Sequence, residues 1–216
     1  MMEPRDDRGN PVEWGSVRAA IFDVDGTLYF QPPVRRRMAL RLAAHLLRRP
    51  GFARELWGIY WFRKVRETEA FRVRPLADQV AEAARRARLS DPEKLAAGIR
   101  RWMFQEPLPL IAAHANREVL GWIAALRAAG GRVLIYSDYA PEEKLAALGV
   151  KPDAVYAPGR EGITELKPSA SAMAHILASE GLSPAEMVYV GDRPEKDGES
   201  AALVGMRYVR VTSAGA

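Results

Sequence analysis

The sequence predicts an α/β fold, in which a block of α-helices is inserted into a parallel β-sheet core. Three apolar runs with the length of buried strands support this prediction, and helical periodicity separates them. Alternating strands and helices build a parallel sheet, because each return to the sheet must cross one of its faces. The three runs are residues 19–24, 132–136 and 187–190.

Each of these runs leads into polar residues at its carboxyl end. The first leads into Asp23 and Asp25, the second into Ser137, and the third into Asp192. The carboxyl ends of parallel strands form one edge of the sheet, and ligands bind along that edge in open α/β sheets. We therefore expect these side chains, which are distant in the sequence, to meet at one site.

Asp23 and Asp25 are two residues apart at the end of the first strand, so their side chains point to the same face. Gly26 follows them and lets the backbone turn. Two converging carboxylates repel each other unless a cation or a shared proton relieves the repulsion. The pair therefore indicates a divalent metal and acid/base chemistry.

Helical patterns interrupt the core after the first strand. The chain leaves the core at the turn-rich Gln31-Pro32-Pro33 and returns after Pro107-Leu108-Pro109. We expect a flexible N-terminal segment at residues 1–18, a core at 19–31 and 115–216, and a helical insertion at 32–114. Helices are predicted at about 34–47, 53–70, 75–89, 90–104, 117–129, 141–148, 168–180 and 199–204, and two further strands at 154–157 and 207–211.

The composition excludes several classes of site and compartment. The 216 residues contain no cysteine, which excludes disulfides, thiolate metal sites and cysteine nucleophiles and fits a reducing compartment. The N-terminus has no apolar region typical of a secretory signal, and no apolar stretch reaches transmembrane length. We expect a cytoplasmic protein that does not enter the membrane.

The formal net charge of +5 is unevenly distributed. Residues 31–114 hold 18 Lys and Arg and 8 Asp and Glu. The rest of the chain holds the other 14 of the 32 basic residues and the other 19 of the 27 acidic residues. We interpret most of these arginines as solvated helix faces, with one or two that attract an anionic substrate. Arginine content alone is weak support for nucleic-acid binding, which we do not expect.

The segment 56–62 is strongly apolar and is flanked by basic residues. We interpret it as the hydrophobic core of the inserted helices. An interfacial membrane helix and a dimer surface are the two alternatives, and a homodimer is left open.

Four motifs in chain order resemble those of the haloacid dehalogenase superfamily. They are Asp23-Val24-Asp25-Gly26-Thr27, Ser137 at a strand end, Lys167 before a helix, and Gly191-Asp192 followed by Asp197. Each motif alone is weak, but their order and spacing together make a specific signal. The resemblance implies a Rossmann-like core, and the inserted helices resemble the helical cap of many members of this superfamily.

The resemblance also implies roles for the first pair of carboxylates. Asp23 would be the nucleophile that attacks phosphorus and forms an aspartyl-phosphate. Asp25 would protonate the leaving group and then take a proton from the water that hydrolyses the intermediate.

The other motif residues would hold the phosphoryl group and the metal. Ser137 and Lys167 would bind the phosphoryl group, with Asp138 beside it where relatives often carry Asn. The expected cofactor is Mg²⁺, which prefers hard oxygen ligands. Its candidate ligands are Asp23, Asp25 through the backbone carbonyl, Asp192, and Asp197 directly or through water.

These roles describe a Mg²⁺-dependent phosphatase acting on a small phosphate ester. A dehalogenase is a competing hypothesis, but a halide leaves without a proton and such an enzyme needs no metal. A phosphomutase or phosphotransferase would keep every motif residue. A catalytically weak binding or regulatory protein is a further alternative, and the intact nucleophile and acid argue against it. The inserted helices would decide the substrate.

Overall fold

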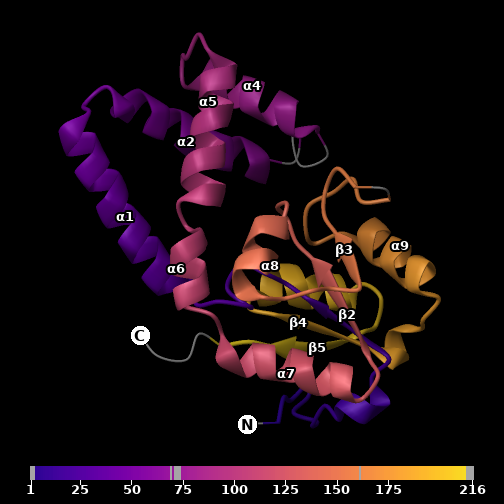
Figure 1. The fold of residues 1–216 in the computed structure, drawn as a ribbon. Helices are drawn as coiled ribbons and strands as arrows, with labels where there is room; N and C mark the ends of the chain where they lie inside the picture. The colour runs from indigo at the N-terminus through magenta and orange to yellow at the C-terminus, as the bar shows by residue number, and fades with distance from the viewer. Residues whose placement is uncertain (1–2, 69, 71–73, 161, 213–216) are drawn as a thin grey trace. The chain divides into compact units, whose positions relative to one another are not determined.

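The contacts in the computed structural model divide the chain into two compact units (Figure 1). The structure describes residues 3–68, 70, 74–160 and 162–212. The core unit consists of Met1–Gln31 and Ile111–Ala216, and the helical unit of Pro32–Leu110. The chain therefore returns to the core at Ile111, slightly before the expected residue 115.

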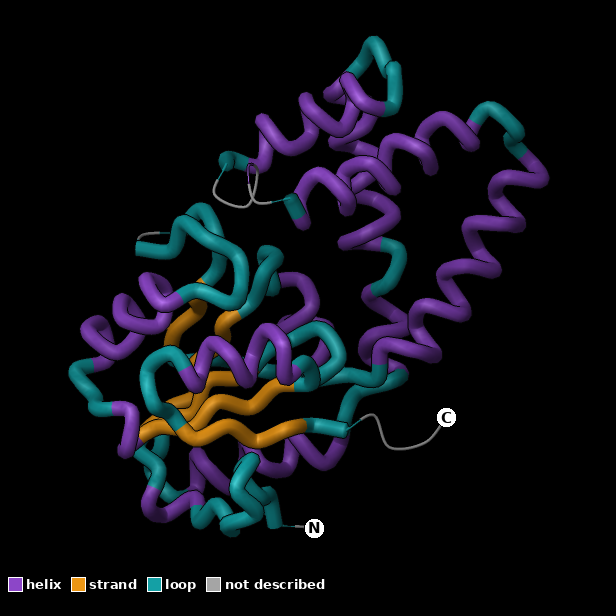
Figure 2. The backbone as a smooth tube through the Cα atoms, turned by 180° about the vertical axis from the view of Figure 1, so that it is seen from behind, coloured by secondary structure: helices purple, strands orange, loops and turns teal. Residues whose placement is uncertain are grey.

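The core unit contains a five-stranded parallel sheet, which confirms the predicted fold class (Figure 2). The strand order is β3-β2-β1-β4-β5, and in the central strand Ala19 lies opposite both Arg132 and Met187. All five strands lie where the sequence predicts them. They are β1 (Ala19–Phe22), β2 (Arg132–Tyr136), β3 (Ala154–Tyr156), β4 (Met187–Gly191) and β5 (Arg207–Arg210).

The strand order creates one switch point in the sheet. The chain adds β2 and β3 on one side of β1 and then crosses to add β4 and β5 on the other side. The crevice outside the carboxyl ends of β1 and β4 is therefore where a ligand is expected to bind. Asp23 and Asp192 lie beyond these two ends, and the Asp23 N–H donates to the carbonyl of Val190 in β4 (2.9 Å).

Helices cover the sheet because both of its faces are apolar. On one face Ile21, Leu134 and Tyr189 share a buried cluster with Met173 and Ile176 of α9 (Ala170–Glu180). Strand side chains alternate in direction, so the remaining buried strand residues form a second face. Two further helices, α7 (Arg117–Ala128), which contacts β2, and α10 (Glu199–Ala202), which contacts β5, complete the packing.

The proline-containing segments at the two ends of the helical unit are starts of helices, whereas the sequence predicts turns there. The chain leaves the core unit at Gln31-Pro32-Pro33 as predicted, but this segment forms the first turn of α1 (Gln31–Arg48) and not a loop. Likewise the helical unit ends at Leu110, beside Pro107-Leu108-Pro109, but Pro109 itself lies in the first turn of α6 (Leu108–Ala113). Proline is tolerated in the first turn of a helix, where its missing N–H has no partner to lose.

The N-terminal segment differs from the flexible segment that the sequence predicts. Over its described part, the Asp7 N–H donates to Tyr208 of β5 (2.8 Å), and the Arg18 N–H donates to Glu186 (2.9 Å). Val12 and Val17 are buried. A polar composition obscured these two apolar anchors, which attach the segment to the core unit.

Besides α1 and the start of α6, the described residues of the helical unit form three α-helices and one short π-helix. These are α2 (Phe52–Glu67), α4 (Leu76–Arg86), α5 (Pro92–Ile99) and η2 (Arg100–Gln105). Asp91 caps α5, since its side chain accepts a hydrogen bond from the Lys94 N–H (2.9 Å). None of the helices in the described residues is both long and apolar enough to cross a membrane.

The apolar segment 56–62 divides between the core and the surface of the helical unit. Phe62 is fully buried and Ile59 is buried, as the interpretation of this segment as core requires. Trp57 and Tyr60 are 50% and 46% exposed, and their rings stack with centroids 5.1 Å apart.

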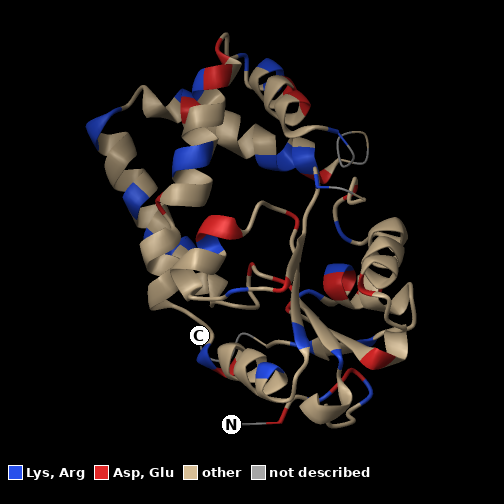
Figure 3. Ribbon diagram, turned by 45° about the vertical axis from the view of Figure 1, so that its right-hand side comes forward, with Lys and Arg blue, Asp and Glu red and all other residues tan. Residues whose placement is uncertain are grey.

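Lys and Arg residues of this unit are spread over several helices rather than gathered on one (Figure 3).

This division predicts different costs for two substitutions in one helix. Phe62→Ala removes a fully buried ring and should destabilise the protein by about 3–5 kcal/mol. Trp57→Ala removes a half-exposed ring and should cost about 1 kcal/mol. Urea unfolding followed by circular dichroism measures both. Equal costs would contradict the assignment of Phe62 to the core of the helical unit.

Candidate active site

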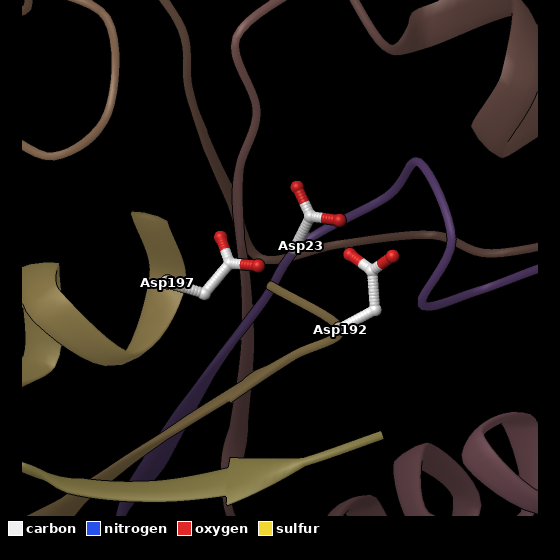
Figure 4. A group of neighbouring side chains, drawn as sticks. All are labelled: Asp23, Asp192 and Asp197. Atoms are coloured by element: carbon white, nitrogen blue, oxygen red, sulfur yellow. The ribbon is translucent and has the colours of Figure 1, made fainter. Parts of the chain in front are cut away.

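Three carboxylates meet at the switch point of the sheet (Figure 4). Asp23 follows β1, Asp192 follows β4, and Asp197 lies on the short helical turn Pro194–Gly198 (η4). One oxygen atom from each carboxylate lies within 4.8 Å of the other two. The sequence predicts this convergence, and these carboxylates are called the acidic cluster below.

Two glycines let the acidic cluster form. A Cβ atom at Gly26 would lie 2.1 Å from Oδ2 of Asp192, and the backbone there has a φ of +104°. A Cβ atom at Gly191 would lie 2.5 Å from Oδ2 of Asp197. Any side chain at either position would therefore displace one of the carboxylates.

Lys167 is buried within the acidic cluster. Its Nζ lies 2.7 Å from Oδ1 of Asp23 and 2.9 Å from Oδ1 of Asp197. The rings of Tyr136 and Tyr189 lie 5.0 and 5.5 Å from the same atom. Burial alone would lower the pKa of Lys167, but Asp197 and Asp23 hold it well above its usual value. The lysine is therefore a cation at this site.

Burial raises the pKa values of both Asp23 and Asp192. Burial raises the pKa of Asp23 to about 7, with Lys167 opposing the shift and Asp197 adding to it. Burial and Asp197 also raise the pKa of Asp192 to about 6. The Thr27 hydroxyl donates to Oδ2 of Asp23 (3.1 Å), so both oxygens of Asp23 have a partner.

A divalent cation fits the acidic cluster. Oδ1 of Asp192 is buried and accepts no hydrogen bond from the residues that the structure describes. One oxygen of Asp192 lies within 4.8 Å of an oxygen of Asp23 and of an oxygen of Asp197, and carboxylate oxygens are the ligands that Mg²⁺ prefers. Both oxygens of Asp197 already accept hydrogen bonds, one from Lys167 and one from the Arg193 N–H (3.1 Å). Among the described residues, Asp192 thus offers an oxygen without a hydrogen-bond partner, whereas Asp23 and Asp197 would share their oxygens between the ion and hydrogen-bond donors.

The Asp25 carboxylate is turned toward a different partner. Its oxygens lie 2.5 and 2.7 Å from Nζ of Lys144, and the Tyr29 hydroxyl also donates to Oδ1. Burial alone would raise the pKa of Asp25, but Lys144 and Tyr29 lower it overall. Only the backbone carbonyl of Asp25 is then left for a metal, as the resemblance implies.

Ser137 and Asp138 occupy the end of β2 as expected. Ser137 is buried, and its Oγ accepts from the Tyr139 N–H (3.3 Å). Asp138 accepts from the Lys167 N–H (2.9 Å) and from Nζ of Lys196 (3.0 Å). Burial alone would raise the pKa of Asp138, but Lys167 and Lys196 lower it overall. Asp138 therefore ties together two loops of the site, a function that its place in the motif did not predict.

Sequence reasoning missed the residues that hold the motif side chains in place. Lys144 and Tyr29 orient Asp25, and Lys196 pairs with Asp138. No local pattern marks them, because a lysine on a short charged helix is ordinarily a solvated residue. A buried partner 119 residues away is visible only once the fold is known.

The family model of the haloacid dehalogenase-like hydrolases matches residues 17–205. The chain belongs to this family. The match covers the four motifs and strands β1 to β4, and it ends just before β5. No curated protein sequence matches the chain.

Solved structures of this family share the fold. A HAD phosphatase from Thermococcus onnurineus has a TM-score of 0.60 and 21% identity, covering 93% of this chain and 88% of that chain. The putative HAD-hydrolase YfnB from Bacillus subtilis, bound to magnesium, has a TM-score of 0.61 and 14% identity, covering 89% and 87%. The L-2-haloacid dehalogenase from Xanthobacter autotrophicus has a TM-score of 0.60 and 21% identity, and the match covers 90% of this chain and 77% of that chain. The TM-scores establish a common fold, and identities this low establish the fold alone.

The raised pKa values predict a pH-dependent effect of Mg²⁺ on stability. The folded protein holds protons on Asp23 and Asp192 more tightly than the unfolded chain does. These protons stabilise the metal-free fold at a pH below the usual carboxyl pKa, and the contribution is lost as the pH rises through about 6 to 7. Mg²⁺ must displace these protons. The increase in melting temperature caused by Mg²⁺ should therefore be larger at pH 8 than at pH 5, as measured by scanning calorimetry.

Asp192→Asn is the matched variant for this measurement. It removes one charge from the acidic cluster and should reduce the increase in melting temperature that Mg²⁺ causes at pH 8. An increase of the same size at both pH values, or one unchanged by Asp192→Asn, would place the ion elsewhere.

Proposed function

We propose that this hydrolase is a Mg²⁺-dependent phosphatase that forms an aspartyl-phosphate at Asp23 from a small phosphomonoester. The observation that carries the proposal is the acidic cluster beside Asp25. It supplies oxygen ligands for a divalent cation, and Asp25 supplies a group for proton transfer. Phosphoryl transfer depends mostly on positioning and on neutralising charge, which this arrangement provides.

In the first step, the Asp23 carboxylate attacks phosphorus and the ester oxygen leaves. Lys167 and Thr27 each bond one oxygen of Asp23, so the carboxylate has a defined orientation. Asp25 is ionised in the free enzyme, because Lys144 and Tyr29 outweigh burial and lower its pKa, so it passes the proton of a monoanionic ester to the leaving alcohol. Mg²⁺, when bound, neutralises charge on the phosphoryl oxygens. Ser137, at the carboxyl end of β2, would bind that group.

In the second step, water attacks the phosphorus of the aspartyl-phosphate. Asp25, again a carboxylate, takes a proton from the water and passes it to the departing phosphate, and the Asp23 carboxylate is restored. The enzyme returns to its starting state, and one ester has become an alcohol and a phosphate.

A haloacid dehalogenase is the alternative that the structural relatives raise. Attack on carbon expels a halide, which needs no proton from Asp25 and no metal. That chemistry gives Asp192 no metal to bind, although its carboxylate is directed into the site beside Asp23 and Asp197. The acidic cluster therefore favours phosphoryl chemistry.

An assay of both substrate classes tests this proposal. With Mg²⁺ the protein should release phosphate from p-nitrophenyl phosphate, and it should lose this activity in excess chelator. Asp23→Asn should abolish phosphate release, since an amide is a poor nucleophile. L-2-chloropropionate is the matched dehalogenase substrate, and no chloride should appear. Chloride release, or phosphate release that is unaffected by chelator, would overturn the assignment. Transfer to an added alcohol would identify a phosphotransferase.

Asp25 should matter most for substrates with basic leaving groups. An alkyl phosphate expels an alkoxide that needs a proton, whereas an activated aryl phosphate expels a phenolate that needs it far less. Asp25→Asn should slow formation of the aspartyl-phosphate from the alkyl ester by about 10²–10⁴-fold and from the aryl ester much less. Rapid-quench kinetics measures this step. An equal loss for both esters would leave Asp25 with a structural role.

A further inference from the structure

Lys144 is a buried cation that none of the four motifs contains. It lies on α8 (Glu142–Leu148), the helix that follows β2, and its side chain is 8% exposed. Its Nζ contacts both oxygens of Asp25, whose side chain is 16% exposed. An ammonium loses several kcal/mol of hydration when it is buried, so it is found inside proteins only with a matched partner. The contact is therefore specific.

The surroundings of Lys144 restrict it to this partner. The ring of Tyr139 lies 5.8 Å from Nζ and adds a second attraction for the ammonium. On the side of β1, the Tyr29 hydroxyl donates to Oδ1 of Asp25. The carboxylate is thus held between α8 and the chain that follows β1.

The hydrogen bonds of Asp25 leave room for one more donor. An ionised carboxylate has about four lone-pair sites. Lys144 uses one on each oxygen, and Tyr29 uses a second on Oδ1. The remaining site is on Oδ2. A proton donor that approaches Asp25, such as a water molecule, therefore has a single atom to meet.

We propose that Lys144 is a positioning residue for Asp25, and that its ammonium fixes the carboxylate so that Oδ2 takes the proton of the hydrolytic water. This inference rests on the proposed function, since it assigns a cause to the rate of the second step. Lys144 itself touches neither the phosphorus nor the water. Its effect passes entirely through the orientation of Asp25.

Lys144→Met tests the proposal because methionine keeps the length of the side chain and removes the charge. With p-nitrophenyl phosphate the first step needs little help from Asp25. The variant should therefore give a full burst of one p-nitrophenol per enzyme. Steady-state turnover after the burst should be at least about 10-fold slower than in the wild type. The loss should not exceed the rate enhancement of about 10²–10⁴-fold that a general base supplies. Acid quenching should trap the accumulated phospho-enzyme.

Two matched variants separate positioning from other roles. Lys144→Arg keeps the charge and should restore part of the turnover. Lys151→Met removes an exposed lysine just beyond α8 and should behave as wild type. A burst that shrinks together with turnover would show lost folded enzyme. A higher KM at unchanged kcat would show substrate binding. Either result would overturn the proposal.

A melting-temperature cycle tests the ion pair without using activity. Lys144→Met should lower the melting temperature of the wild type, because it leaves the Asp25 carboxylate buried and without its cation. The same change should have much less effect in Asp25→Asn. Equal effects in both backgrounds would mean that the pair is absent in solution and would overturn the proposal. A wild type that is inert toward every phosphate ester would instead refute the proposed function, and the catalytic role of Lys144 with it, while a coupled cycle would still establish the pair.

Discussion

The ammonium of Lys167 is the charge on which the rest of the site depends. It is fully buried between Asp23 and Asp197, and in the described structure it is the cation that touches both. Removing one partner of a buried ion pair is far more damaging than replacing the whole pair, because an uncompensated charge remains. The acidic cluster therefore tolerates three carboxylates at close range only with a cation held inside it.

The backbone around Lys167 is controlled as closely as its side chain. Its N–H donates to Asp138, and Asp138 also accepts from Lys196 in η4. One buried carboxylate thus connects the end of β2, the loop before α9 and the turn that carries Asp197. Three segments from distant parts of the sequence share a single set of hydrogen bonds, so a change in one loop is transmitted to the others.

The strands and the motif residues could be predicted because their signals are local. Apolar runs mark β1, β2 and β4, and parallel topology brings their carboxyl ends to one edge. The contacts of Lys144 and Asp138 could not be predicted, since long-range pairing leaves no periodic pattern in the sequence. The helix starts at Gln31 and Leu108 were missed because proline signals both a break and a first turn.

The environments of Asp23 and Asp25 push their pKa values in opposite directions. Burial and Asp197 raise that of Asp23, whereas Lys144 and Tyr29 outweigh burial and lower that of Asp25. Neighbouring carboxyl groups with separated pKa values can take different roles in one reaction. A divalent cation at the acidic cluster favours the ionised form of Asp23, which is the form that a nucleophile needs. Asp25 gains its charge from the protein instead, so it can serve as a base whether or not the metal contacts it. The two carboxylates of one short motif thus obtain their charges from independent sources.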